Sequence, residues 1–234
     1  MEAEREGIAI GLSTETEGDD DAEETDDAEP EDDFNAAWEV LDLARAIYNK
    51  QAEKDPDDEV KLKLADIYIA LGDVSLETGI LHSHSYPTVL IVFAEKFDQA
   101  ITDYSAGLAL KKELLPPSSR QIAEAHYKLS MVLDLTPGRL ADAIDHVEMA
   151  LASVETRLAE LRDALNGRIH AKKHETVKDT NDKVNAFGGR LVRDGSVHDM
   201  TKSQIESEIT ELEGLKDDLA LKVSWDVLLD PSFC

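Results

Sequence analysis

Carboxylates are the side chains of this sequence with the clearest chemical character. Thirteen of the nineteen residues from Glu15 to Asp33 are Asp or Glu, and none is Lys or Arg. Such a run attracts cationic partners over about a Debye length, roughly 8 Å at physiological salt. A solubilising tail is the alternative interpretation, since net charge by itself keeps proteins in solution. The candidate binding residues of this tract are Glu23, Glu24, Asp26, Asp27, Glu29, Glu31, Asp32 and Asp33.

The residue types that support catalysis or metal binding form no usable pattern. His82 and His84 are separated by one residue and His170 and His174 by three, but no third ligand stands at a metal-binding spacing. Cys234 is the single cysteine, and neither a Gly-rich phosphate loop nor a Ser/His/Asp arrangement occurs. We therefore expect no enzymatic activity, no metal and no other cofactor.

Composition narrows the classes of partner. The acidic tract supplies about half of the formal charge of −27, a field that repels nucleic acid and anionic membrane. The most apolar run, residues 88–94, is much shorter than the roughly 20 residues that span a bilayer. One cysteine rules out an internal disulfide framework and suits a reducing compartment. We expect a soluble protein that binds neither DNA nor membrane directly.

Apolar periodicity predicts an all-α fold of paired helices. Apolar residues recur every three or four positions from Ala37 to Ile47, with Asp33 or Asn35 as the helix cap, and Trp38 and Tyr48 are expected to pack between helices. Similar anchors recur in three segments, Ala37/Leu41/Ala44, Ala100/Tyr104/Gly107 and Ala143/Val147/Ala150. This internal repeat is typical of tetratricopeptide hairpins, in which small residues allow close helix approach.

Helix breakers and caps divide the rest of the chain. Pro116-Pro117, the 136–138 turn and Asn166-Gly167 end helices, and Thr201-x-x-Gln204 is a capping box that opens the last helix. A long helix that ends at 165 is expected to cap the stack, with the last helix packed against it. The predicted regions are a disordered acidic segment at 1–33, a tetratricopeptide-like domain at 34–165, a linker at 166–200, a C-terminal helix at 201–222 and an irregular tail at 223–234.

Several segments together resemble one family. They are AWEVLDLARAIY (37–48), LGDVSLET (71–78), EKFDQAITDY (95–104) and IAEAHYKLSMVL (122–133), with the acidic tract directly before the first. The chain resembles the interrupted-tetratricopeptide histone chaperones related to nuclear autoantigenic sperm protein, in a fungal-type form. The resemblance implies binding of histone H3, alone or with H4, in support of histone supply and chromatin assembly. It also implies other chromatin-assembly partners and a nuclear location, with a cytoplasmic pool and the oligomeric state left open.

In tetratricopeptide repeats the first helix of each pair lines a concave groove. With Gly72 and Ser130 at the small-residue position, the groove residues are Asp66, Ile69, Asp73, Leu76, Glu77, Glu124, Tyr127, Met131 and Asp134. Five of these nine are acidic and none is basic. We expect the groove to accept a basic, partly apolar segment through Asp66, Asp73, Glu77, Glu124, Tyr127 and Asp134. The carboxylate clamp of heat-shock co-chaperones, which needs Lys and Arg, is not expected. The alternatives are a solvated helix face and, for the whole chain, a general adaptor with an inert acidic arm.

Three features depart from the family pattern. The family has a complete repeat and a further helix before the acidic tract, so we expect an N-terminal truncation that leaves the helix at 34–54 without its hairpin partner. Residues 79–94 form an anomalous insert between Gly72 and Ala100, which is either a retained intron or a loop at the hairpin turn with an apolar VLIVF packed on the stack. Residues 224–234 lose the charged helical composition, and Val223-Ser224 is what a splice donor would encode if it were read through.

Overall fold

The computed structural model describes residues 30–55, 57–85, 90–167 and 197–229. Six α-helices and one short 3-10 helix account for nearly all of these residues, and the described ranges contain no strand. The elements are α1 (Pro30–Lys54), α2 (Asp58–Ser85), α3 (Leu90–Leu114), α4 (Arg120–Asp134), α5 (Leu140–Leu165), η2 (Val197–Asp199) and α7 (Lys202–Leu229). The predicted all-α fold class is confirmed, and none of the described helices is long and apolar enough to cross a membrane.

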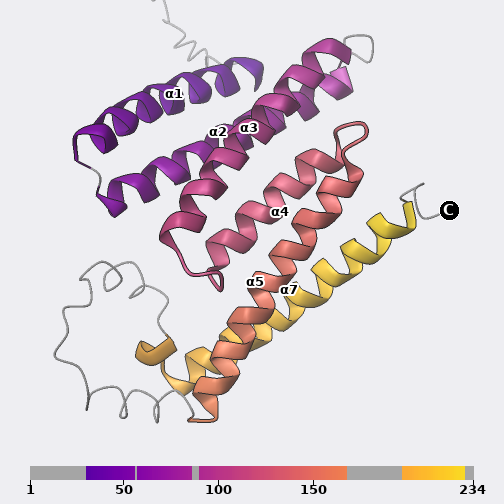
Figure 1. The fold of residues 1–234 in the computed structure, drawn as a ribbon. Helices are drawn as coiled ribbons and strands as arrows, with labels where there is room; N and C mark the ends of the chain where they lie inside the picture. The colour runs from indigo at the N-terminus through magenta and orange to yellow at the C-terminus, as the bar shows by residue number, and fades with distance from the viewer. Residues whose placement is uncertain (1–29, 56, 86–89, 168–196, 230–234) are drawn as a thin grey trace, which may run out of the picture.

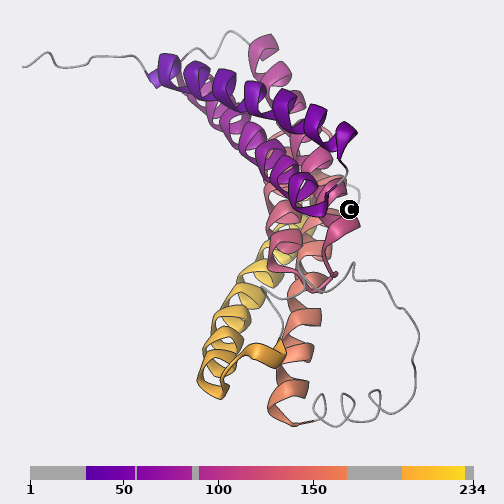
Figure 2. The ribbon, with the colours of Figure 1, turned by 90° about the vertical axis from the view of Figure 1, so that its left-hand side faces the viewer.

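The helices stack as successive hairpins. α2 pairs with α3 and α4 with α5, while α3 packs against α4 to join the two hairpins. α1 lies on α2 at one end of the stack, and α7 runs along α5 at the other (Figures 1 and 2). This arrangement follows from amphipathic helices that bury one face each against a neighbour.

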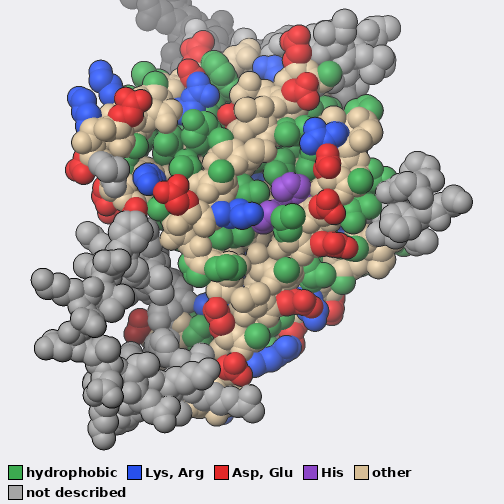
Figure 3. All heavy atoms as spheres, in the orientation of Figure 1, with side chains coloured by type: hydrophobic (Ala, Val, Ile, Leu, Met, Phe, Trp, Pro, Cys, Tyr) green, Lys and Arg blue, Asp and Glu red, His purple; other side chains and the backbone are tan. Residues whose placement is uncertain are grey.

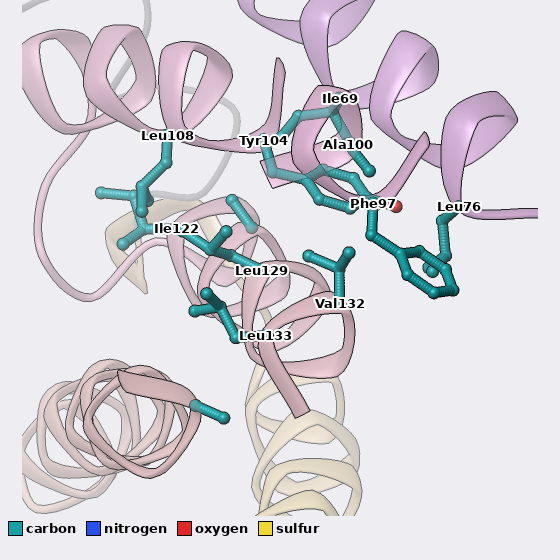
Figure 4. Close-up of a cluster of buried hydrophobic side chains, with 12 residues drawn as sticks. Ile69, Leu76, Phe97, Ala100, Tyr104, Leu108, Ile122, Leu129, Val132 and Leu133 are labelled. Carbon is teal, nitrogen blue, oxygen red and sulfur yellow. The ribbon is translucent and has the colours of Figure 1, made fainter. Parts of the chain in front are cut away.

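The first buried cluster joins the two hairpins around Tyr104, which is fully buried on α3 (Figure 4). The tyrosine ring lies against Gly72 of α2, where an added Cβ would come within 2.6 Å of two ring carbons. Gly107 of α3 similarly faces Ala65 and Ile69 of α2. Glycine at these two positions is what lets the backbones of α2 and α3 approach closely, as the repeat anchors predicted.

A second buried cluster forms the C-terminal end of the stack. α5 contributes Val154, Leu158 and Leu161, against which α7 places Ile205 and Leu212. The predicted capping box at the start of α7 is present, because the Thr201 backbone N–H donates to Gln204 Oε1 (2.8 Å) and the Gln204 N–H donates to Thr201 Oγ1 (3.3 Å). The prediction that the last helix packs against the long α5 is confirmed.

The predicted helix breaks are also in place. α3 ends before Pro116-Pro117, and the chain re-enters a helix at Arg120 with Ser119 as N-cap. Gly138 and Gly167 have φ values of 78° and 72°, which glycine adopts without the Cβ penalty of other residues. The turn at 136–138 and the end of α5 therefore follow from sequence alone.

The N-terminal helix differs from its prediction in start and register. It begins at Pro30 rather than near 34, since proline is favoured in the first helical turn and acidic residues there suit the helix dipole. The predicted buried face is wrong, because Ala37 is exposed and Ile47 is 55% exposed, and Trp38, expected to pack between helices, is also exposed. α1 packs chiefly on α2, so one narrow strip that includes Leu41 and Tyr48 is half-buried.

Two other boundaries were wrong. Residues 79–85 continue α2 and residues 90–94 begin α3, so the insert lengthens both helices instead of forming a loop at the hairpin turn. Its first residue, Gly79, is buried against Phe97.

The tail predicted to be irregular from 223 is helical as far as Leu229. The predicted disorder of residues 1–29 and the linker at 168–196 lie outside the described residues, and Val197 of η2 is buried in the second cluster.

A matched pair of glycine substitutions tests the close approach of α2 and α3. Gly72→Ala is expected to lower the free energy of unfolding by about 1–3 kcal/mol, because its methyl group has no space beside Tyr104. Gly214→Ala in α7 is expected to raise it by roughly 0.5–1 kcal/mol, since no atom lies within 4 Å and alanine favours a helix. Urea denaturation followed by circular dichroism measures both. Equal effects would contradict the packing role of Gly72.

Candidate binding groove

The acidic tract leads directly into α1. Glu31, Asp32 and Asp33 belong to the first turns of this helix, and Asp33 is exposed. The other candidate residues of the tract, from Glu23 to Glu29, lie outside the described residues. The tract is therefore joined without a break to the helix that packs on α2.

The nine residues predicted to line the groove separate into two groups. Leu76 is buried in the first core cluster, so its prediction as a groove-lining residue was wrong. Ile69 belongs to the same cluster but also borders a hollow between α2, α3 and α4. Ile69 and Leu76 lie one turn before and one turn after Gly72, which contacts Tyr104 of α3, so both belong to the face of α2 that packs on α3. The other seven are at least partly exposed: Asp66, Asp73 and Glu77 on α2, and Glu124, Tyr127, Met131 and Asp134 on α4.

Asp73 connects three helices. One of its oxygens accepts a hydrogen bond from the Tyr104 hydroxyl of α3 (2.7 Å). Lys128 of α4 donates to both carboxylate oxygens, at 2.8 and 2.7 Å. Lys128 also lies 3.7 Å from Glu124 in the preceding turn of its own helix. Burial, followed by the hydrogen bond to Asp73, raises the pKa of Tyr104 far above its usual value, so its hydroxyl stays a donor.

A second lysine binds Asp66. Lys111 of α3 is almost fully buried, and its ammonium donates to Asp66 and to Gln121 Oε1 (2.7 Å). These groups border a hollow of about 270 Å³ between α2, α3 and α4. The hollow is lined by Asp66, Ile69, Lys111, Gln121, Glu124 and Ala125. The hollow therefore forms a recess in the groove, between Asp66 of α2 and Glu124 of α4.

The groove is less acidic than its nine predicted residues suggested. Lys111 and Lys128 neutralise part of its charge, and Lys222 of α7 lies 3.1 Å from Asp134 at the far end of α4. Glu77 is exposed and makes no ion pair among the described residues. On the face of the molecule in Figure 3, acidic and basic side chains are likewise interspersed. The groove therefore carries a modest negative excess, and the lysines thought absent from it are present but paired.

The lysines of the groove were missed for different reasons. Lys128 follows Glu124 by four residues, a spacing that brings side chains together on a helix and could have revealed the pair. Lys111 lies on the second helix of a hairpin, so only the packing of α3 against α2 brings it to the groove. Lys222 lies 88 residues from its partner, and no local pattern indicates that contact.

Two exposed apolar side chains give the groove a further property. Tyr127 and Met131 are one turn apart on α4 and are 39% and 37% exposed. They lie between the carboxylates of Glu124 and Asp134 along the same helix. This order suits a ligand that combines apolar and basic side chains, because methionine and tyrosine adapt to varied apolar surfaces.

A histidine pair connects α4 to α5 outside the groove. The Nδ1 atoms of His126 and His146 lie 2.8 Å apart, and their ring centroids are 5.0 Å apart. Neutral rings satisfy this contact when one Nδ1 donates and the other accepts. Burial, then His146 and Lys112, lower the pKa of His126 to about 4, and burial also lowers the pKa of His146. Purple histidine side chains lie together in Figure 3.

Within the described residues, no group of three or more His, Cys, Asp or Glu is placed to hold a metal ion. The side chains of His82 and His84, and all of His170 and His174, lie outside what the structure describes.

Comparison of the sequence with known proteins agrees with the fold of stacked helical hairpins. A model of the SHNi-TPR family matches residues 93–118, which comprise most of α3 and the turn after it. The NASP-related protein sim3 of Schizosaccharomyces pombe is 37% identical over 148 residues, covering 58% of this chain and 33% of sim3. The chain is thus similar in sequence to the interrupted-tetratricopeptide proteins related to nuclear autoantigenic sperm protein (NASP).

Other NASP relatives match over similar parts of the chain. Histone-binding protein N1/N2 of Xenopus laevis is 30% identical over 122 residues, which cover 52% of this chain and 17% of that protein. Human nuclear autoantigenic sperm protein is 27% identical over 127 residues, covering 54% and 14%. This chain thus spans about a third or less of the length of these three relatives.

The histidine pair predicts acid sensitivity of the fold. The folded-state pKa of His126 lies below the ordinary value of 6.5, so the unfolded chain binds the proton first and stability falls as pH drops through this interval. We expect a loss of about 2 kcal/mol from this residue between pH 7 and pH 5. Thermal unfolding at several pH values measures it. His126→Asn, which keeps a polar atom near the position of Nδ1, should flatten the decline, and an unchanged slope would contradict the assignment.

Proposed function

We propose that this chain is a non-enzymatic histone chaperone that binds histone H3, alone or with H4. The observation that carries the proposal is the direct connection of a polyanionic tract to the groove. The tract runs into α1, α1 packs on α2, and α2 bears Asp66, Asp73 and Glu77. The names of the relatives support the same class of partner, since one is a histone-binding protein.

The two parts would contribute differently to binding. The tract acts at long range, where its charge accelerates encounter with a cationic protein and competes with DNA for the same lysines and arginines. Exposed ion pairs are each worth below about 1 kcal/mol, so the tract must act through number. The groove acts at contact, where Tyr127 and Met131 offer apolar surface between carboxylates.

This role fits a nuclear protein that supports histone supply and chromatin assembly. Other chromatin-assembly proteins are further candidate partners. A formal charge of −27 opposes direct binding to DNA, so any effect on chromatin would come through histones rather than through contact with nucleic acid.

Charge removal from the tract tests the proposal. Replacing the Asp and Glu of residues 15–33 by Asn and Gln should slow association with H3–H4 by about tenfold or more at low salt, because electrostatic steering is lost. Stopped-flow fluorescence at increasing salt measures the rates, which should converge with those of the unaltered chain. A chain with the tract residues in shuffled order is the control and should keep the fast rate.

The same proteins separate the proposal from its alternative. A general adaptor with an inert acidic arm would associate at equal rates with and without the tract charges. It would also prefer H3–H4 no more than lysozyme, another basic protein, in a competition titration. Equal rates would reject the role of the tract, and an equal preference for lysozyme would reject histone chaperone activity for this chain.

A further inference from the structure

The groove already contains cations, and two of its lysines, Lys111 and Lys128, differ in how firmly they are held. Lys111 has a side chain only 6% exposed, and its ammonium is bound by Asp66 and Gln121. A buried charge that loses its partners is costly, so this lysine is a fixed part of the groove wall. Lys128 is 25% exposed, and the Asp73 and Glu124 side chains that it contacts are 42% and 58% exposed. Water reaches this second set of ion pairs.

Exposed ion pairs exchange partners readily because solvent replaces the lost contact. Asp73 has a further support that does not depend on Lys128, since the buried Tyr104 hydroxyl also donates to it. The carboxylate would therefore keep its position if the ammonium of Lys128 moved away. The neighbouring hollow of about 270 Å³ shares Glu124 with this set of ion pairs and has room for a further side chain. Its other lining residues are Asp66, Ile69, Lys111, Gln121 and Ala125.

We propose that Lys128 sets the selectivity of the groove by competing with the basic side chains of a partner. A lysine or arginine of the partner can form ion pairs with Asp73 and Glu124 only by displacing the ammonium of Lys128. Weakly basic segments are rejected by this competition, whereas segments with several properly spaced cations overcome it. The inference rests on the proposed function in that it treats the groove as the contact surface for a basic protein.

Removal of this internal competitor should strengthen binding. Lys128→Met keeps an unbranched stem and removes the charge. We expect it to raise the affinity for a short peptide of alternating lysine and leucine by about three- to fivefold at low salt, the size of one exposed ion pair. Fluorescence anisotropy with the labelled peptide measures the change, which should vanish at high salt.

Lys63→Met is the matched control. Lys63 is an exposed residue of α2 that pairs with Glu59 of its own helix, so this change alters the net charge equally without touching the groove contacts. Binding by Lys128→Met that is no tighter than binding by Lys63→Met would overturn the proposal. Thermal unfolding of each variant is measured alongside. If Lys128→Met does not fold, Lys128→Gln takes its place with the same expected result.

A second variant identifies the carboxylate responsible. Asp73→Asn keeps an acceptor for the Tyr104 hydroxyl and removes the charge. In this background Lys128→Met should strengthen peptide binding less than it does in the unaltered chain, because only the weaker contact with Glu124 is left to be freed. A full gain in the absence of the Asp73 charge would assign the effect to another group and overturn the competition.

Titration with H3–H4 distinguishes this inference from the proposed function. If H3–H4 is not captured but the peptide binds Lys128→Met more tightly than the control, the histone proposal fails and the role of Lys128 stands. If H3–H4 is captured but Lys128→Met and Lys63→Met bind the peptide equally, the proposed function stands and the role of Lys128 fails.

Discussion

The contact between Tyr104 and α2 is the constraint on which the rest of the structure depends. The tyrosine is fully buried, and its ring lies against Gly72 while its hydroxyl donates to Asp73 of the same helix. A buried hydroxyl requires a partner, so the position of the ring fixes the carboxylate next to Gly72. That carboxylate also binds Lys128 of α4. One side chain thereby sets the spacing within a hairpin and the position of a charged group in the groove between hairpins.

This arrangement explains how a strongly acidic protein can have a groove of moderate charge. About half of the formal charge of −27 belongs to the tract, whereas acidic residues of the folded part are often paired with lysine or arginine. Examples are Asp66 with Lys111, and Glu208 of α7 with Arg157 of α5 at 2.8 Å. Unbalanced charge opposes compaction of a folded domain. The proposed function accordingly assigns long-range attraction to the tract and short-range discrimination to the groove.

Features that depend on residues close together in the sequence could be predicted, whereas contacts between residues far apart in the sequence could not. Breaks at prolines and glycines, the capping box at Thr201 and the anchors around Tyr104 and Val147 depend on local chemistry, and all were predicted correctly. The buried face of α1 was predicted wrongly because its burial depends on how many other helices pack against α1, and α1 packs chiefly on α2. Leu76 was misplaced because the faces toward α3 and toward the groove are adjacent on α2. The pairing of Asp66 with Lys111 joins residues 45 positions apart, which no periodicity reports.

The two ends of the stack differ in a way that bears on how the tract and groove act together. α7 covers α5 through a buried cluster, whereas α1 leaves Val40, Leu43 and Ile47 more than half exposed. The tract is attached to this less covered end. α1, which carries the last residues of the tract, has 25 residues and therefore a length of about 37 Å along α2. Under the proposed function, a partner held by the tract would be tethered to this end of the stack. Its local concentration at the groove would rise, so that even weak contacts with Asp73 and Tyr127 would become effective.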